Sequence, residues 1–161
     1  MNNLPKRKQI RLKDYDYSQN GYYFITICTK DRKNLFWETD SNPVGADIIR
    51  PKLSPCGEIA ERAIHNISSH YVHICADQYV IMPDHIHLIL KISNTAESGR
   101  MVSAPTTSTV VGQMKRWISR EIGEPVWQKS FFEHIIRDKE DYLARLEYMQ
   151  NNPLKHVIQK I

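Results

Sequence analysis

The apolar positions of the chain repeat with two periods, one typical of strands and the other of helices. A period of two, rich in Val, Ile, Tyr and Phe, predicts β-strands, and it covers residues 22–29, 72–82, 85–92 and 131–137. A period near 3.6 predicts amphipathic helices, and it covers residues 55–70, 107–122 and 139–151. The predicted order is β-α-β-β-α-β-α. We therefore expect an α+β fold with a ferredoxin-like β-α-β-β-α-β core, an antiparallel sheet with helices on one face, and a C-terminal helix.

Local sequence marks where several of these elements begin and end. Ser54 followed by Pro55 is typical of a helix N-cap and the first helical position. Gly123 is expected to stop the second helix, and Pro153 to end the third. Residues 30–53 and 93–107 lose the periodicity and gain proline and glycine, so we predict loops there, the second of them flexible.

The composition is that of one globular domain, which we take to span residues 1–161. Apolar residues make up 41% of the chain and charged residues 25%, both ordinary for such a domain. No apolar run approaches the roughly 20 residues of a membrane span, and the three cysteines have neither paired nor metal-type spacing. We therefore expect no membrane association and a location in a reducing cytoplasm.

The charge is mildly basic, with a formal net charge of +4 and a pI of about 8.9. The positions of the cations matter more than their sum. One cluster lies in a basic, aromatic N-terminal arm within residues 1–20 and consists of Lys6, Arg7, Lys8 and Arg11. The other lies in the predicted second helix and consists of Lys115, Arg116 and Arg120. Although a charge run is usually a solvated surface, two such clusters favour a polyanionic partner such as nucleic acid.

Two histidines stand at alternate positions of one predicted strand. Side chains in a strand point alternately to opposite faces, so His85 and His87 project together, while the apolar residues between and after them form a core face. Two imidazoles at this spacing can bind one metal ion, usually with a further ligand. A hydrogen-bonded histidine pair without a metal is the alternative.

The last predicted helix carries a tyrosine outside its apolar stripe. Its stripe consists of Tyr142, Leu143, Leu146 and Met149, whereas Tyr148 falls on the face shared with Asn152, one helical turn later. A core tyrosine should lie within the stripe. Tyr148 is therefore either an exposed surface residue or a functional one.

These motifs together resemble those of the single-tyrosine HUH transposases, of the insertion-sequence type, and in particular their REP-associated tyrosine transposase branch. The resemblance covers nearly the whole chain, in the order Asp16-Tyr17-Ser18-Gln19-Asn20-Gly21, Met82-Pro83-Asp84-His85-Ile86-His87, Val126-Trp127-Gln128, Phe131-Phe132-Glu133-His134-Ile135-Ile136-Arg137 and Glu147-Tyr148-Met149-Gln150-Asn151-Asn152-Pro153-Leu154-Lys155. The histidine motif alone is weak, but its combination with the later Tyr-x-x-x-Asn-Pro is specific. Asp84 departs from the asparagine often found at that position.

The resemblance implies a metal-dependent enzyme that cleaves and rejoins single-stranded or hairpin DNA through a 5′-phosphotyrosine intermediate. It makes Tyr148 the nucleophile, with His85, His87 and Asn152 as ligands of Mg²⁺ or Mn²⁺. His134 is a candidate auxiliary base, and a structural histidine is the alternative. Contacts to DNA are expected from the basic arm with Tyr17 and Asn20, and from Lys115, Arg116 and Arg120. Such a protein would act at the nucleoid of a bacterial-type cell.

Two other functions stay open on the sequence. A domesticated, catalytically inactive protein would bind hairpin DNA without cleaving it. A metal-dependent hydrolase would cut through activated water and leave Tyr148 without a role. Since relatives of this kind work as dimers or as monomers, a homodimer is also left open, as are the DNA target and the cleavage position.

Overall fold

The structure is a computed structural model, and it describes residues 11–39, 52–94 and 105–158. Its centre is a four-stranded antiparallel sheet in the order β2-β3-β1-β4. The strands are β1 (Gly21–Cys28), β2 (Ile74–Ile81), β3 (His85–Ile92) and β4 (Phe132–Ile136). The helices are α1 (Pro55–His65), α2 (Ile67–His70), α3 (Thr107–Ile122) and α4 (Lys139–Ile158). The predicted α+β fold and order of elements are confirmed.

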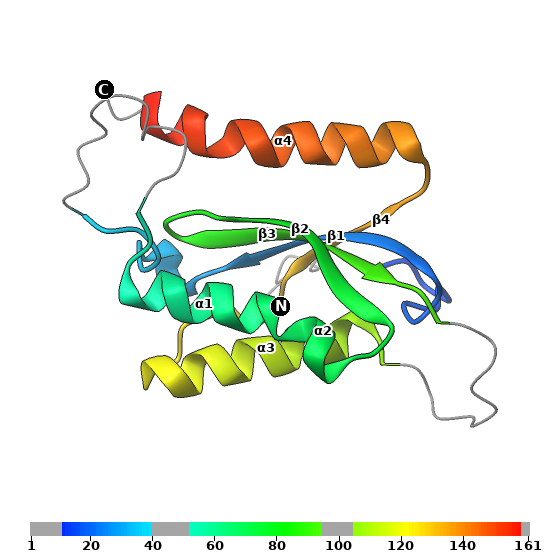
Figure 1. The fold of residues 1–161 in the computed structure, drawn as a ribbon, viewed down its shortest axis with the longest axis horizontal. Helices are drawn as coiled ribbons and strands as arrows, with labels where there is room; N and C mark the ends of the chain where they lie inside the picture. The colour runs from blue at the N-terminus through cyan, green and yellow to red at the C-terminus, as the bar shows by residue number, and fades with distance from the viewer. Residues whose placement is uncertain (1–10, 40–51, 95–104, 159–161) are drawn as a thin grey trace, which may run out of the picture.

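The sheet lies between two helical layers (Figure 1). Helices α1 and α3, which make the two crossovers, share one face of the sheet, as predicted. Helix α4 crosses the other face, so the description "helices on one face" holds for the crossovers and not for the last helix. This second layer follows from the connectivity, because α4 comes after the fourth strand and the first face is already filled by α1 and α3.

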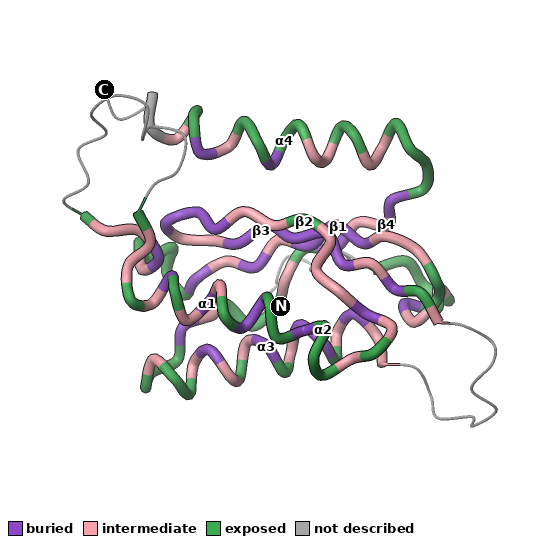
Figure 2. Tube along the Cα trace, in the orientation of Figure 1, coloured by how far each residue is buried: buried purple, intermediate pink, exposed green. Residues whose placement is uncertain are grey.

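The two faces of the central strands follow the alternation of the sequence. Ile86, Leu88 and Leu90 are fully buried toward α1 and α3, as predicted. The opposite face of β3 and β1 is apolar as well, since Ile89 and Phe24 are buried under α4. Complete burial of each such side chain contributes about 1.5–3 kcal/mol. Figure 2 shows buried segments in the central strands β1 and β3, while α4 is mostly exposed or intermediate, with Met149 and Pro153 as its buried described residues.

Helix ends on the crossover side fall close to their predictions. The Ser54 hydroxyl accepts a hydrogen bond from the backbone N–H of Gly57 and caps α1. Gly123 ends α3 with a φ of 88°, a left-handed conformation that glycine adopts without steric cost. The helix predicted over 55–70 is interrupted at Asn66, and α2 turns so that Ile67 is buried in the core.

Helix α4 continues through Pro153 to Ile158, so the predicted end near residue 151 was wrong. Proline removes one backbone hydrogen bond and disfavours a helical residue before it. Tertiary packing outweighs this cost here, because Pro153 is buried and the His156 ring lies edge-on to Trp37, with 5.4 Å between centroids.

The face of α4 that packs on the sheet differs from the apolar stripe predicted from the sequence. Met149 is buried against the sheet, whereas Leu143 is 49% exposed. The polar face with Asp141 and Asn152 is turned toward the sheet, where both side chains find hydrogen-bond partners. Among the described residues, no helix has the length and apolar character needed to cross a bilayer.

Much of the two predicted loops, namely residues 40–51 and 95–104, lies outside the described residues. In the remainder of the first loop, residues Lys30–Arg32 form a short 3-10 turn, and Trp37 forms an isolated bridge with Leu53. The 3-10 turn lies beside the histidine pair.

Candidate active site

The histidine pair lies on the face of the sheet that α4 covers. His85 and His87 are in β3, and the register pairs His87 with Thr26 of β1. The two imidazoles point their Nε2 atoms at each other, 3.1 Å apart. His87 is only 3% exposed and its ring stacks on Phe24, with 5.4 Å between centroids. The predicted projection of both histidines to one face is confirmed.

Hydrogen bonds fix both rings through their other nitrogens. The Nδ1 atom of His85 lies 2.6 Å from a carboxylate oxygen of Asp84, and the Nδ1 atom of His87 lies 2.7 Å from the Thr26 hydroxyl. An ionised carboxylate can only accept, so the proton of neutral His85 is on Nδ1 and its Nε2 presents a lone pair. These contacts orient the rings as second-shell groups orient metal-binding histidines.

Both histidines are held in the neutral form. Burial, then the neighbouring His85 and Arg32, lowers the pKa of His87 to about 3. Burial also lowers the pKa of His85, although the hydrogen bond to Asp84 opposes this effect. Neutral imidazoles are the form that binds metal ions.

Asp84 is itself held by an arginine from a strained turn. Arg32 Nε lies 2.8 Å from the second carboxylate oxygen of Asp84. Arg32 and Asp31 have φ values of 54° and 57°, a left-handed conformation that costs non-glycine residues of order 1–3 kcal/mol. Hydrogen bonds from the Thr29 backbone and hydroxyl to the Asp84 carbonyl tie this turn to the residue before the histidines.

Helix α4 brings Tyr148 and Asn152 to the same place. The Asn152 side-chain nitrogen is 2.8 Å from His87 Nε2. The Tyr148 ring lies edge-on to His87, with 5.3 Å between centroids, and it is 48% exposed. The structure thus joins the four residues predicted for the site, although about sixty positions separate His87 from Tyr148 in the chain.

His134 lies on the neighbouring strand and is engaged by a carboxylate. Its Nε2 atom is 2.7 Å from Asp141, which also contacts Arg145. Burial opposes ionisation of Asp141, but its hydrogen bonds with His134, the Arg137 backbone and Arg145 hold its pKa below the usual value. Arg145 in turn lies over the Phe24 ring, 5.4 Å from the centroid. His134 is therefore a positioned residue at the edge of the site.

The side chains present fit a divalent cation. With Nδ1 of His85 protonated, its Nε2 lone pair points at the Nε2 of His87, 3.1 Å away, and this Nε2 also lies 2.8 Å from the side-chain nitrogen of Asn152. A cation held here would be bound by the lone pairs of both neutral imidazoles. The described residues hold no group of three or more His, Cys, Asp and Glu side chains suited to a metal. Asn152, whose amide also carries an oxygen, is the third polar group at this point.

The basic arm is placed only from Arg11 onward, since Lys6, Arg7 and Lys8 lie outside the described residues. Arg11 forms an ion pair of 2.7 Å with buried Glu133 and lies over the Tyr17 ring. Tyr17 is 7% exposed within the main core. Burial argues against the predicted contact of Tyr17 with DNA, and the ion pair assigns Arg11 a structural role that the charge pattern did not indicate.

Asn20 and the cations of α3 lie away from the histidines. Asn20 exchanges two hydrogen bonds with the backbone of Asn94, at 3.0 and 2.6 Å. Lys115 donates to the carbonyl of Gln128, and burial lowers its pKa. Since α3 covers the other face of the sheet, Lys115, Arg116 and Arg120 form a surface separate from the histidine pair (Figure 1).

The sequence pattern did not indicate two residues of the site, Thr26 and Arg32. Thr26 interrupts the apolar pattern of β1 on the face of Phe24, a signal that was present but had no partner without the strand register. Arg32 is one of several cations in an aperiodic segment, and only its left-handed turn directs it to Asp84.

Comparison with known proteins gives consistent matches. Residues 17–152 match the family model described as "Transposase IS200 like". An "Uncharacterized protein" of Haemophilus influenzae is 34% identical over 167 residues, covering 92% of this chain and 88% of the relative. The "REP-associated tyrosine transposase" of Escherichia coli is 23% identical, covering 87% and 70%.

A solved structure supports the fold. The "REP associates tyrosine transposase bound to a REP hairpin" superposes with a TM-score of 0.64 at 20% sequence identity, covering 91% of this chain and 74% of that one. At 20% identity, the superposition supports the fold alone. The described sheet and its two helical layers thus have a counterpart among experimentally determined structures.

Proposed function

The chain belongs to the IS200-like transposase family, and from this premise we propose that it cleaves and rejoins single-stranded or hairpin-associated DNA through a covalent link to Tyr148. The observation that carries the proposal is the placement of the Tyr148 ring 5.3 Å from His87, whose Nε2 faces that of His85. A phenol is a poor nucleophile at neutral pH, and a cation bound by the two neutral histidines would offset the negative charge of the phosphate that it attacks.

We infer that Mg²⁺ or Mn²⁺ is held by His85, His87 and the amide oxygen of Asn152. When bound, the ion would polarise the scissile phosphate and offset its negative charge. The Asp84 carboxylate holds the Nδ1 proton of His85, and the Thr26 hydroxyl fixes the orientation of the His87 ring. A site with only two nitrogen ligands and one amide would bind these oxygen-preferring ions weakly.

The protein itself contributes to the reaction by positioning the nucleophile Tyr148 beside the histidine pair. The α4 helix holds the Tyr148 hydroxyl one turn from Asn152, and the ring contacts with His87 and Phe24 limit its motion. In cleavage, the Tyr148 oxygen forms a bond to phosphorus as the bond to the 3′ oxygen breaks. The departing oxygen takes up a proton and becomes a 3′-OH. Attack of a 3′-OH on the tyrosine ester reverses this step and rejoins strands without ATP.

The phenolic proton needs an acceptor. The Tyr148 hydroxyl has no hydrogen-bond partner in the described part of the chain, and it is half exposed, so water can reach it. His134, held by Asp141, is the protein residue we propose as auxiliary acceptor or as a relay to solvent. Replacement of His134 by Gln would then slow cleavage and shift its pH profile while leaving DNA affinity unchanged.

The test is trapping on denaturing gels. Wild type, Tyr148→Phe and Tyr142→Phe are incubated with labelled hairpin DNA and Mn²⁺, with EDTA in parallel. Tyr142 is the matched control, since it lies on the same helix and its hydroxyl bonds Asp77 instead. We expect a metal-dependent, protease-sensitive adduct with wild type and Tyr142→Phe and none with Tyr148→Phe.

The other outcomes separate the alternatives. Cleavage by all three proteins without an adduct would indicate a hydrolase that activates water. Binding of the hairpin without cleavage by any of them, across a panel of hairpins, would indicate an inactive DNA-binding protein. Either result overturns the proposed covalent role of Tyr148.

A further inference from the structure

A groove of about 430 Å³ opens between α1, α2 and α3, on the face of the sheet opposite the histidine pair. Its floor is apolar, formed by side chains that belong to the main core: Ala63, Ile67, Val110 and Met114. The rim is polar and aromatic, with Asn66, His70, Tyr71, Gln113, Arg116, Trp117 and Arg120. None of the residues of the proposed active site takes part in it.

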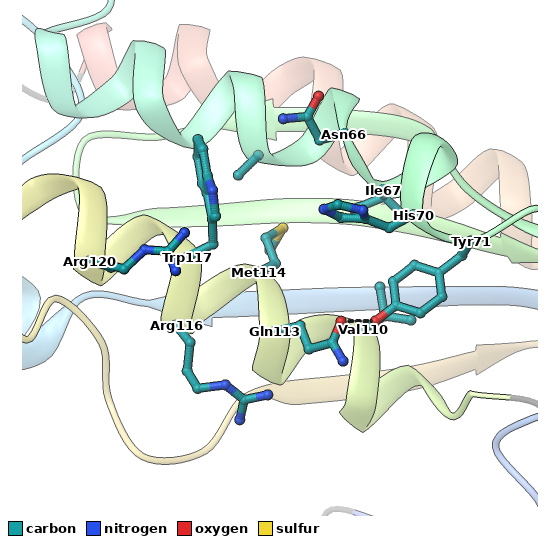
Figure 3. A pocket seen from close by; sticks show the side chains of 11 residues that line it. Asn66, Ile67, His70, Tyr71, Val110, Gln113, Met114, Arg116, Trp117 and Arg120 are labelled. Atoms are coloured by element: carbon teal, nitrogen blue, oxygen red, sulfur yellow. Dashed lines mark hydrogen bonds between the residues drawn. The ribbon is translucent and has the colours of Figure 1, made fainter.

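One of the two cations of the groove lies beside its tryptophan, and the other is farther away. Figure 3 shows the Trp117 ring rising from α3 toward α1, with Arg120 beside it, while Arg116 extends from α3 away from the indole. Trp117 is only partly buried, although it packs against the core. One edge of the groove is fixed, because the Tyr71 hydroxyl donates a hydrogen bond to the Gln113 side chain.

The charges of the rim lack compensation within the described residues. Arg116 has no carboxylate at ion-pair distance in that part of the chain, and the contact of Arg120 is a long one of 3.9 Å to exposed Glu121. Two cations beside an apolar floor and an aromatic ring are complementary to an anion that carries a flat apolar group. The size is also suitable, since small-molecule sites commonly enclose about 300–1,000 Å³.

We propose that this groove binds one unpaired nucleotide of single-stranded DNA. The base would stack on Trp117 above the apolar floor, and Arg120 and Arg116 would contact its phosphate and the next one. Stacking platforms combined with cations are the general means of holding single strands without sequence preference. This inference rests on the proposed function, because it gives the same DNA a second point of contact on the far face of the protein.

A purely structural role does not account for this set. A core tryptophan needs no cation beside it, and surface arginines that only aid solubility need no apolar groove. The amide groups of Asn66 and Gln113 stand at the rim, where they can meet the edge of a stacked base. A second copy of the chain is a weaker match, since the rim is cationic and its described cations would repel each other across an interface.

The test separates binding from cleavage by using the Tyr148→Phe background throughout. Affinity for a short oligo(dT) is measured by fluorescence anisotropy at several salt concentrations for Trp117→Ala, Arg120→Gln and Arg116→Gln. Arg62→Gln is the matched control, because Arg62 is an exposed arginine of α1 that does not line the groove. Circular dichroism checks that each variant is folded.

We expect Trp117→Ala to weaken binding by roughly 5- to 150-fold, the usual loss for one stacked base. Each arginine variant should lower affinity and reduce the magnitude of the salt slope by about 0.7 per lost phosphate contact. Arg62→Gln should retain the slope of its parent. Unchanged affinity and slope in all three groove variants would overturn the proposal.

Cross-linking gives an independent readout of the site. Oligo(dT) carrying 5-iodouracil is irradiated with the Tyr148→Phe protein and digested with trypsin, which releases residues 117–120 as one peptide. A nucleotide on Trp117 supports the groove, and cross-links confined to other peptides contradict it. If groove variants change self-association in sedimentation but not DNA binding, the groove is a protein interface and the proposal fails. The Tyr148 adduct is measured separately, so either inference can fail while the other stands.

Discussion

Replacement of Thr26 by Val tests whether the second hydrogen bond of His87 stabilises the site. Valine keeps the shape of threonine and removes the hydroxyl that lies 2.7 Å from His87 Nδ1. His87 is buried, so its Nδ1 would be left without a partner in a region closed to water. A buried polar group that loses its partner costs about 1–3 kcal/mol. For a chain of 161 residues, each kcal/mol lowers Tm by about 2–4 °C.

The same change should weaken metal binding. Loss of an outer-shell partner of a ligating histidine typically lowers metal affinity about 10- to 100-fold. The free energy of unfolding would be measured by urea denaturation in EDTA, and Mn²⁺ affinity by the loss of the free-ion signal in electron paramagnetic resonance. Thr109→Val, at an exposed position of α3, is the control and should change stability by less than about 0.5 kcal/mol. Thr26→Val with unchanged stability and unchanged Mn²⁺ affinity would refute the assigned role of the hydroxyl.

Three further predictions follow from contacts in and near the site. In EDTA, the free energy of unfolding should fall as pH drops from about 6.5 toward 3, because the pKa of His87 is lowered to about 3 and only the unfolded chain takes up the proton in this range. The slope for one such group is at most about 1.4 kcal/mol per pH unit. His87→Gln should flatten this slope in urea titrations, and an unaltered slope would contradict the burial argument. Asp84→Asn should lower Mn²⁺ affinity roughly tenfold, since the amide no longer holds the Nδ1 proton of His85 as strongly; equal affinity in the resonance assay would show that the carboxylate is dispensable. Glu133→Gln should destabilise the fold by about 1–3 kcal/mol and speed proteolysis near Arg11, because it weakens a buried ion pair whose arginine is partly exposed; unchanged urea midpoints and cleavage rates would place the arm elsewhere in solution.

The sequence predicted those features that depend on local periodicity. Alternation in a strand puts His85 and His87 on one face, and helical spacing puts Tyr148 one turn before Asn152. The register of strands and the rotation of helices depend on tertiary packing instead. Thr26 could therefore not be paired with His87 beforehand, and the exposure of Leu143 was missed because polar contacts of α4 with the sheet outweigh its apolar stripe.

Charge and proline were the least informative signals. The basic cluster predicted a contact of Arg11 with DNA but not its ion pair with Glu133, whose burial no sequence pattern indicates. Pro153 predicted the end of α4, yet the helix continues because burial of the proline and the contact of His156 with Trp37 stabilise its last turns. The end of α4 was misplaced because a local proline preference of about 3 kcal/mol is smaller than the packing that it meets.

The covalent role of Tyr148 is tested most simply by locating the DNA-linked residue by mass spectrometry. Wild-type protein that has reacted with hairpin DNA and Mn²⁺ is digested with nuclease and trypsin. The peptide of residues 146–155 contains a single tyrosine, Tyr148, so a nucleotide mass on this peptide identifies the nucleophile. We predict that this mass appears there, requires the metal and is lost in Tyr148→Phe. A nucleotide on any other peptide, or cleavage without a linked peptide, would contradict the proposed chemistry.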